Sequence, residues 1–180
     1  GITGTNGKTT TTYILETLLG NVARLGTIEY KIGDEVYEAP NTTPESLDVI
    51  KMCRKAVDKG INYLVMEVSS HALELGRVDM LEFDTAVFTN LTQDHLDFHK
   101  TMENYFDAKS KLFGKLKDGK KGVVNIDDCW GARLYEKNST KFISTSLDTA
   151  NLTGRITEYT NHDMVVEIAY KGEKYGFTTE

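Results

Sequence analysis

The sequence predicts an α/β fold: a mostly parallel, doubly wound sheet of the P-loop type, flanked by helices, with an antiparallel strand portion at the C-terminal end. Three observations support this prediction. A glycine-rich loop at residues 1–9 opens into an amphipathic helix expected over 10–19. The runs 61–68 and 84–89 are too apolar for half-exposed strands and are typical of a buried parallel sheet. From residue 141 onward the pattern changes to short alternating strands.

Between the first helix and the first buried run, local signals predict a strand, a hairpin and a helix. Residues 21–28 are short and partly β-branched, and 29–38 has the pattern of a hairpin that turns at residues 33–34. Thr43 can cap a helix with Pro44 at its first position, and this helix is expected to run to about residue 59.

The second half of the chain continues the alternation and then changes character. Apolar residues at helical intervals predict a helix over 101–117, followed by a buried strand over 122–126 and a helix near 128–136. Two final strands, 164–170 and 173–178, are expected to join at a Lys-Gly turn. Strands that alternate with helices give a doubly wound sheet, whose ligands bind outside the carboxyl ends of its strands.

One boundary of this arrangement is unusual. A phosphate-binding loop normally follows a buried central strand, and this sequence begins at the loop. We therefore expect residues 1–180 to be one domain excerpted from a longer polypeptide, with the strand that precedes the loop missing from it.

Composition excludes several classes of function. The 180 residues include 21 Lys and Arg against 27 Asp and Glu, a formal net charge of -6, so a broad basic surface for nucleic acid is not expected. The sequence has neither the long apolar run of a membrane span nor the charged and apolar pattern of a secretory leader. Its two cysteines are far apart, which argues against a disulfide framework. A cytoplasmic location is the expectation.

The first residues, GITGTNGKTT, have the chemistry of a phosphate-binding loop. Glycines let backbone N–H groups curl around phosphate oxygens, and the helix that follows adds the positive end of its dipole. Lys8 would reach the β and γ phosphates, and Thr9 would offer its hydroxyl to Mg²⁺. The loop is a variant, because Ile2 stands where the usual spacing has glycine and Gly4 lies inside it. A glycine-rich turn without a ligand is the structural alternative.

Two further segments carry groups suited to a metal. Glu67 falls near the end of the apolar run 61–68, where a carboxylate can hold Mg²⁺ directly or through water; the alternative is a strand-end acid that faces solvent. The segment 90–99, NLTQDHLDFH, follows the next buried run. His95 could complete a second divalent site or contact the γ phosphate, whereas His99 is interpreted as an exposed residue at the start of a helix.

In their order and spacing, GTNGKTT, EVSSHAL, NLTQDHLDFH and NIDD resemble the ATP-binding central domain of the Mur ligases, which form amide bonds in peptidoglycan precursor synthesis. The resemblance covers essentially the whole chain. The combination of NTTP at 41–44 with EVSSHAL at 67–73 is most similar to the branch of this family that adds the third amino acid to UDP-N-acetylmuramoyl-L-alanyl-D-glutamate.

The resemblance implies roles for individual positions. It implies nucleotide binding by Gly4, Thr5, Asn6, Gly7, Lys8, Thr9, Thr10 and Asn125. It implies contacts to the UDP-muramoyl peptide by Asn41, Thr42, Thr43, Ser69 and Arg77. It implies metal binding by Thr9, Glu67, His95 and Lys109, with catalytic roles for Lys8, His95 and Lys109. Leu75 departs from the pattern of members that carry Gln there, and Asn125 has an alternative as a cap of the helix after residue 128.

The implied reaction uses ATP and Mg²⁺ as cofactors. The γ phosphoryl group passes to the D-glutamyl γ-carboxylate, and an amine attacks the resulting acyl phosphate. Lys109 is implied to be carbamylated; Lys111 projects about 200° away on the same helix and is expected in solvent. Family members carry an N-terminal UDP-binding domain and a C-terminal domain that selects the amino acid. Two alternatives remain: another Mur-type ligase such as folylpolyglutamate synthase, and a P-loop ATP-binding module without ligase activity.

Overall fold

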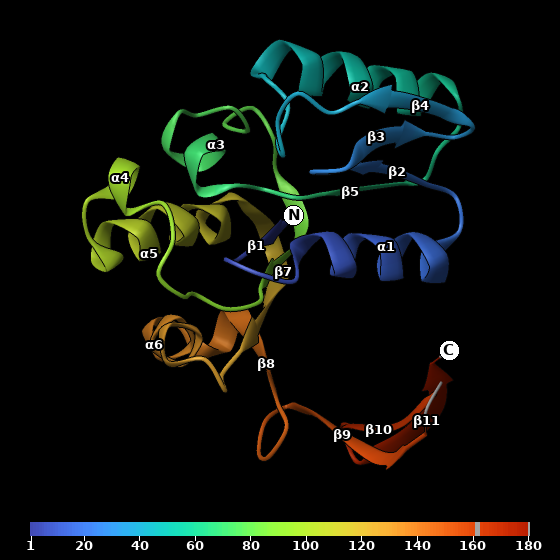
Figure 1. The fold of residues 1–180 in the computed structure, drawn as a ribbon, viewed down its shortest axis with the longest axis vertical. Helices are drawn as coiled ribbons and strands as arrows, with labels where there is room; N and C mark the ends of the chain where they lie inside the picture. The colour runs from blue at the N-terminus through green and yellow to red at the C-terminus, as the bar shows by residue number, and fades with distance from the viewer. Residues whose placement is uncertain (161–162, 180) are drawn as a thin grey trace.

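A computed structural model describes residues 1–160 and 163–179 (Figure 1). The first half of the chain contains β1 (Ile2–Thr3), α1 (Lys8–Leu19), β2 (Val22–Leu25), β3 (Glu29–Ile32), β4 (Glu35–Glu38), α2 (Ser46–Asp58), β5 (Tyr63–Met66), α3 (Ser70–Glu74) and β6 (Phe83–Phe88). The second half contains α4 (Leu96–His99), α5 (Met102–Ser110), η1 (Lys111–Lys115), β7 (Leu116–Asn125), α6 (Cys129–Lys137), η2 (Ser139–Lys141), β8 (Phe142–Ser146), β9 (Leu152–Tyr159), β10 (Met164–Tyr170) and β11 (Glu173–Thr179).

The strands form two hydrogen-bonded sheets, in the orders β4-β3-β2-β5 and β1-β6-β7-β8-β9-β10-β11. A parallel bridge between Ile2 and Glu67 joins them, so the strands continue as one row. The central pairs, from β2–β5 and β1–β6 through β8–β9, are parallel, whereas β3, β4, β10 and β11 pair antiparallel to their neighbours. The predicted fold class is confirmed, including its antiparallel C-terminal portion.

Ile2 and Thr3 lie between β5 and β6 inside this row, although the sequence placed both in the loop. They pair in parallel with Val87 and Phe88 of β6, and the Ile2 carbonyl accepts from the Val68 N–H at 2.8 Å. The assignment of these two residues to the loop was wrong, because their backbone groups are satisfied by strands on both sides. The position in the sheet where the sequence predicted a missing strand is occupied by β1.

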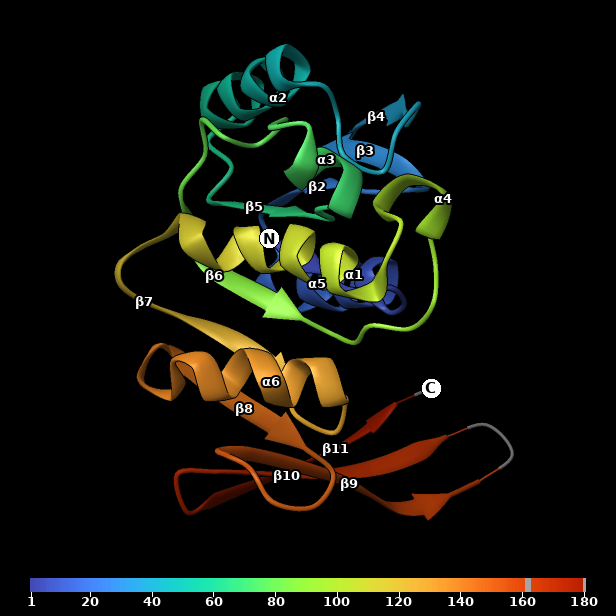
Figure 2. The same ribbon diagram turned by 90° about the vertical axis from the view of Figure 1, so that its left-hand side faces the viewer.

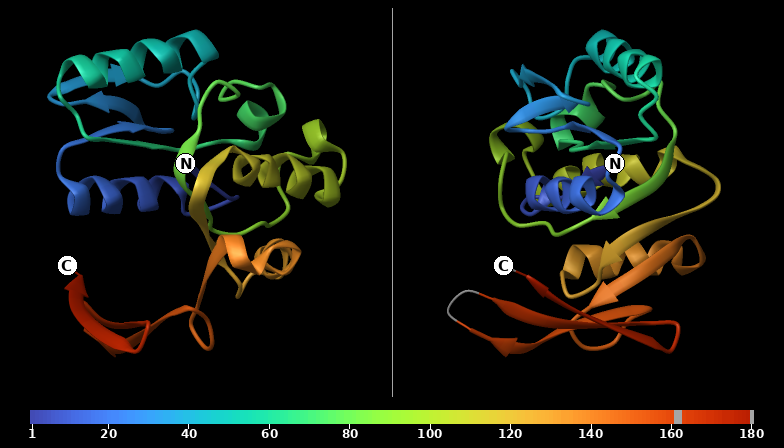
Figure 3. Two further views of the ribbon diagram at one scale, coloured as in Figure 1. Left: turned by 180° about the vertical axis from the view of Figure 1, so that it is seen from behind. Right: turned by 90° about the vertical axis from the view of Figure 1, so that its right-hand side faces the viewer.

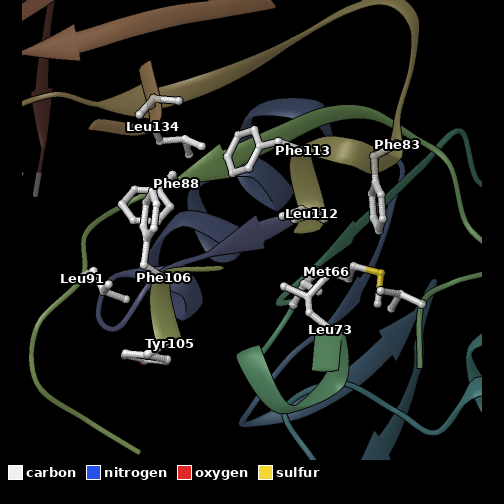
Figure 4. Close-up of a cluster of buried hydrophobic side chains, with 14 of the residues drawn as sticks. Met66, Leu73, Phe83, Phe88, Leu91, Tyr105, Phe106, Leu112, Phe113 and Leu134 are labelled. Atoms are coloured by element: carbon white, nitrogen blue, oxygen red, sulfur yellow. The ribbon is translucent and has the colours of Figure 1, made fainter. Parts of the chain in front are cut away.

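Helices cover both faces of the sheet. Leu15 of α1 packs with Ile2, Val22 and Val65 on one face. Figure 1 shows α1 and α2 on opposite sides of β2 and β3, and Figure 2 shows α5 and α6 in front of the parallel strands with α1 behind. The largest buried cluster lies on the face of α5 and α6, and Figure 4 shows its aromatic residues Phe88, Phe106 and Phe113 close together. Apolar side chains therefore pack against the central strands from both faces.

Several element boundaries differ from those expected from the sequence. The helix α2 begins at Ser46 with Glu45 as its N-cap, not at Thr43, because the Thr43 hydroxyl is used elsewhere. The helix expected over 101–117 is α5 followed by a 3₁₀ turn, and β7 begins at Leu116, earlier than the expected 122. The hairpins of 29–38 and of 164–178 are confirmed, and Figure 3 shows the C-terminal strands at the end of the molecule away from α2. Among the residues described, no helix is long and apolar enough to cross a membrane.

Candidate active site

The phosphate loop lies between β1 and α1 and requires its glycines. Gly4 has a φ of 145°, and a Cβ there would lie 1.9 Å from Thr89 Oγ1. Gly7, with a φ of 84°, is the N-cap of α1 and has no side chain to satisfy the first N–H groups of that helix. Asn90 holds the loop from the end of β6, because its carbonyl accepts from the Thr5 N–H and its Oδ1 from the Asn6 N–H. The N–H groups at the start of α1 are therefore the ones oriented to receive an anion.

Two lysines meet at this loop. Lys8 Nζ donates to the carbonyl oxygens of Gly4 and Thr5 at 3.0 and 2.8 Å, and Lys109 Nζ donates to the same Gly4 oxygen at 2.8 Å. Burial lowers the pKa of Lys8. Burial, and after it the charge of Lys8, lowers the pKa of Lys109 to about 7. Lys111 faces away and forms an ion pair with Glu74, so the two helix lysines lie on different faces as expected.

Glu67 is fully buried, so the interpretation as a solvent-facing acid is wrong. Its Oε1 accepts from the Thr9 hydroxyl and from the Thr27 N–H, both at 2.9 Å, and its Oε2 lies 3.0 Å from Thr27 Oγ1. In residues 1–160 and 163–179, no three His, Cys, Asp or Glu side chains gather into a group that could hold a metal. One carboxylate and one hydroxyl nevertheless fit Mg²⁺, which usually keeps several waters and substrate phosphates among its ligands.

His95 lies beside this centre rather than in contact with Glu67. It has a left-handed φ of 51° and precedes α4, and its ring packs edge-on against His71 at 4.9 Å between centroids. The interpretation of His99 as exposed is wrong: it is buried, and its Nε2 lies 2.9 Å from Ser70 Oγ. Burial also lowers the pKa of His99. Tyr105 packs between these rings and Lys109, whose Nζ is 4.5 Å from the centre of the Tyr105 ring.

The residues expected to contact the UDP-substrate lie around the loop at 41–45. Thr43 is fully buried: its Oγ1 donates to the Glu67 carbonyl and accepts from the Ser69 N–H, so it braces the loop. Arg77 donates from Nη1 to the Thr43 carbonyl at 3.3 Å and pairs with Glu45 at 2.6 Å. The Arg77 Nε is buried without a hydrogen-bond partner. A bound carboxylate or phosphate oxygen would satisfy it.

The remaining three substrate candidates are also engaged by the protein, and Thr42 Oγ1 lies 3.1 Å from Thr27 Oγ1. Asn41 accepts through its carbonyl from the Tyr30 hydroxyl, which fixes the start of the loop. The Ser69 side chain caps α3 by accepting from the Ala72 N–H at 3.1 Å. The bond from the Ser69 N–H to Thr43 Oγ1 holds the loop beside the beginning of α3.

Asn125 is not the cap of α6. That cap is Asp128, whose Oδ1 accepts from the N–H groups of Trp130 and Gly131, so the capping alternative is wrong. Asn125 Nδ2 donates to the Thr89 carbonyl at 2.9 Å and ties the end of β7 to the end of β6. It therefore lies next to the strand end that also holds the phosphate loop. Thr10, in the first turn of α1, is exposed at the same edge.

Sequence reasoning missed Gly26, Thr27 and Asn90. All three come directly after or shortly after strands, at the edge of the sheet where the ligand was expected. Asn90 begins the NLTQDHLDFH segment, so its position offered a signal. Gly26 and Thr27 follow a strand of only four residues, and Glu67, the hydrogen-bond partner of Thr27, lies 40 positions along the chain.

A family model described as the Mur ligase middle domain matches residues 2–180, and the chain belongs to the Mur ligase family. Among curated relatives, it is 54% identical over 178 residues to the UDP-N-acetylmuramoyl-L-alanyl-D-glutamate--2,6-diaminopimelate ligase of Fusobacterium nucleatum subsp. nucleatum, a match covering 96% of this chain and 36% of that protein. The ligase of the same name from Geobacter metallireducens is 54% identical over 157 residues, covering 82% of this chain and 31% of the relative.

Solved structures give the same result for the fold. The structure of a ligase of that name superposes with a TM-score of 0.85 at 28% identity, over 97% of this chain and 37% of that chain. The MurF ligase from Thermotoga maritima, solved in complex with ADP, superposes with a TM-score of 0.71 at 20% identity, over 99% of this chain and 39% of that chain. The present chain spans about a third of the length of its curated relatives.

Proposed function

We propose that this chain is the ATP-binding central part of an ADP-forming ligase of peptidoglycan precursor synthesis. In this proposal the enzyme joins an amino acid to UDP-N-acetylmuramoyl-L-alanyl-D-glutamate. The observation that carries the proposal is a convergence at one sheet edge: the phosphate loop, the Thr9–Glu67 pair and the loop at 41–45 all meet there. Support for the substrate comes from relatives with that name at 54% identity.

The nucleotide proposed for the phosphate loop is ATP, and a Thermotoga maritima relative of the same fold was solved with ADP. The N–H groups at the start of α1 would receive the phosphates, and Lys8 would turn from the Gly4 and Thr5 carbonyls toward the γ phosphate. Asn125 would border the adenine side. Thr9 and Glu67 would hold Mg²⁺, which when bound neutralises charge between the phosphates and the incoming carboxylate. His95 and a carbamylated Lys109 are proposed as further metal-side groups.

The second substrate would lie across the loop at 41–45 and the start of α3. Asn41, Thr42 and Ser69 would contact its UDP-muramoyl peptide, with Thr43 bracing the loop from behind. The unpartnered Nε of Arg77 would complete a fork on an anionic group of the peptide. This arrangement would bring the D-glutamyl γ-carboxylate toward the γ phosphate. The positive charge of Lys8 would offset the repulsion between the carboxylate and the phosphate.

The resulting acyl phosphate would be attacked by the amine of the incoming amino acid, with ADP and phosphate as the other products. Diaminopimelate is proposed as this amino acid from the names of the relatives alone. A UDP-binding part before this chain and an amino-acid-selecting part after it are proposed as partners within one polypeptide, in a cytoplasmic enzyme.

The test is turnover of the full-length polypeptide with ATP, UDP-muramoyl dipeptide and a panel of amino acids, read by mass spectrometry. The expected product is one new amide that forms with diaminopimelate and with equal release of phosphate. Amide formation on a folate or on another acceptor instead would identify a different Mur-type ligase. Tight ATP binding without any amide product would contradict the proposal and favour an ATP-binding module.

A further inference from the structure

Thr27 contacts both oxygens of the buried Glu67 carboxylate. Its backbone N–H donates to Oε1 at 2.9 Å, and its Oγ1 lies 3.0 Å from Oε2. The remaining side-chain partner of Glu67 is the Thr9 hydroxyl at 2.9 Å on Oε1. Thr27 therefore supplies two of the three hydrogen bonds that fix the orientation of this carboxylate, and the only one on Oε2 among the described residues.

The residue before Thr27 leaves room for this approach. A Cβ at Gly26 would lie 2.3 Å from Glu67 Oε1, closer than any real contact between these atoms. The glycine allows the backbone to pass directly against the carboxylate, so that the next N–H group can reach it. The Thr27 side chain itself is exposed, and its hydroxyl adds no core packing.

Thr27 also contacts the loop expected to bind the UDP-substrate. Its Oγ1 lies 3.1 Å from Thr42 Oγ1. The Thr27 hydroxyl is therefore within hydrogen-bond distance of both Glu67 Oε2 and Thr42 Oγ1. Thr27 links the loop at 41–45 to the buried carboxylate.

We propose that Thr27 is a positioning residue for this site: it orients the Glu67 carboxylate toward the metal and links that orientation to Thr42. The inference rests on the proposed function, because it takes Glu67 as the metal-side carboxylate. Groups that orient a metal ligand typically change metal affinity or activity by about 10- to 100-fold when they are removed. Thr27 acts through Glu67 in this scheme and needs no contact with the reacting atoms.

The experiment measures binding of Mn²⁺ in the presence of ADP to the full-length protein by electron paramagnetic resonance, independently of turnover. Thr27→Val, which keeps the backbone N–H and loses the hydroxyl, is expected to weaken Mn²⁺ binding about tenfold. Thr27→Ser should stay within about twofold of the wild type. Thr17→Val is the matched control, because its hydroxyl bonds within α1 to the Tyr13 carbonyl. The melting temperature of each variant reports on folding.

Thr42→Ala is the second variant whose Mn²⁺ binding is compared with that of the wild type. It removes only the hydroxyl contact to Thr27 and leaves both Thr27 contacts to Glu67, so its effect on Mn²⁺ binding should be smaller than that of Thr27→Val. Unchanged Mn²⁺ affinity in Thr27→Val, or an equal loss in Thr42→Ala, would overturn the inference. A wild-type protein that binds Mn²⁺ with ADP but forms no amide would instead contradict the proposed reaction, and the comparison of Thr27 variants would still stand.

Discussion

The ammonium groups of Lys8 and Lys109 donate to one and the same atom, the carbonyl oxygen of Gly4, at 3.0 and 2.8 Å. Two like charges on one oxygen repel each other, and the pKa of Lys109 is lowered to about 7 by burial and by Lys8. An anion that entered the phosphate loop would relieve this repulsion. Lys109 therefore loses its proton at a lower pH than a lysine of ordinary pKa.

Lys8→Ala is expected to lower ATP turnover by about 10²-fold or more, because it removes a cation from the developing charge at the γ phosphate. The fold should persist, since Lys8 bonds only to loop carbonyls. Phosphate release measures the loss of turnover, and the melting temperature shows whether the fold persists. Lys111→Ala, which breaks only an exposed pair with Glu74, is the control. Near-normal turnover of Lys8→Ala would contradict the role of the phosphate loop.

Substitutions of the two neighbouring threonines should differ in effect. Thr42→Ala is expected to weaken binding of the UDP-substrate and leave ATP binding nearly intact, since the two sites use different loops. Thr43→Ala removes the buried hydroxyl that donates to the Glu67 carbonyl and accepts from the Ser69 N–H, and should also destabilise the protein by about 1–3 kcal/mol. Calorimetric titration with each ligand and thermal unfolding separate these effects. Equal loss of both ligands in Thr42→Ala would contradict the two-site arrangement.

Gly26→Ala is expected to lower turnover by about 10-fold or more, because the new Cβ would displace the Glu67 carboxylate that it meets at 2.3 Å. Gly114→Ala is the matched control, since a Cβ at that position would find open space. Both variants are measured for amide formation and for the Mg²⁺ concentration that gives half-maximal rate. Equal behaviour of the two variants would show that the close approach of Gly26 to Glu67 has no catalytic consequence.

Lys109 is expected to be carbamylated. CO₂ adds to a neutral amine, and a pKa lowered from 10.5 to about 7 means that the folded protein releases the Lys109 proton as pH rises through about 7. Modification should therefore increase from about pH 6 to about pH 8, where a lysine of ordinary pKa stays protonated. Carbon-13 NMR of protein equilibrated with labelled bicarbonate measures it, and Lys109→Ala should remove the signal.

Chemical rescue tests the same residue independently of pH. Acetate or propionate should partly restore turnover to Lys109→Ala, because a small carboxylate can occupy the place of the lost carbamate. Lys111→Ala should need no rescue, since that side chain pairs with Glu74 on the other face. Full activity of Lys109→Ala without any added acid would exclude a catalytic carbamate.

Features that depend on neighbouring residues follow from the sequence alone. Glycines at fixed spacing before an amphipathic helix define the phosphate loop, and apolar periodicity defines α1, β5 and β6. Turn chemistry at residues 33–34 and 171–172 was sufficient for the two hairpins. These signals are local because each is set by the φ and ψ preferences of a few residues and by which side chains share a face.

The pairing of polar groups depends instead on contacts between distant segments of the chain. Thr43 was a good helix cap by local chemistry, yet its hydroxyl bonds to the carbonyl of Glu67, 24 positions away. His99 was expected in solvent and is buried against Ser70, and Thr27 gave no local signal for its contact with Glu67. The strand order brings these distant segments together. A polar group that is buried in this way must take whichever partner lies nearest in space, because an unmade hydrogen bond there costs more than any local preference.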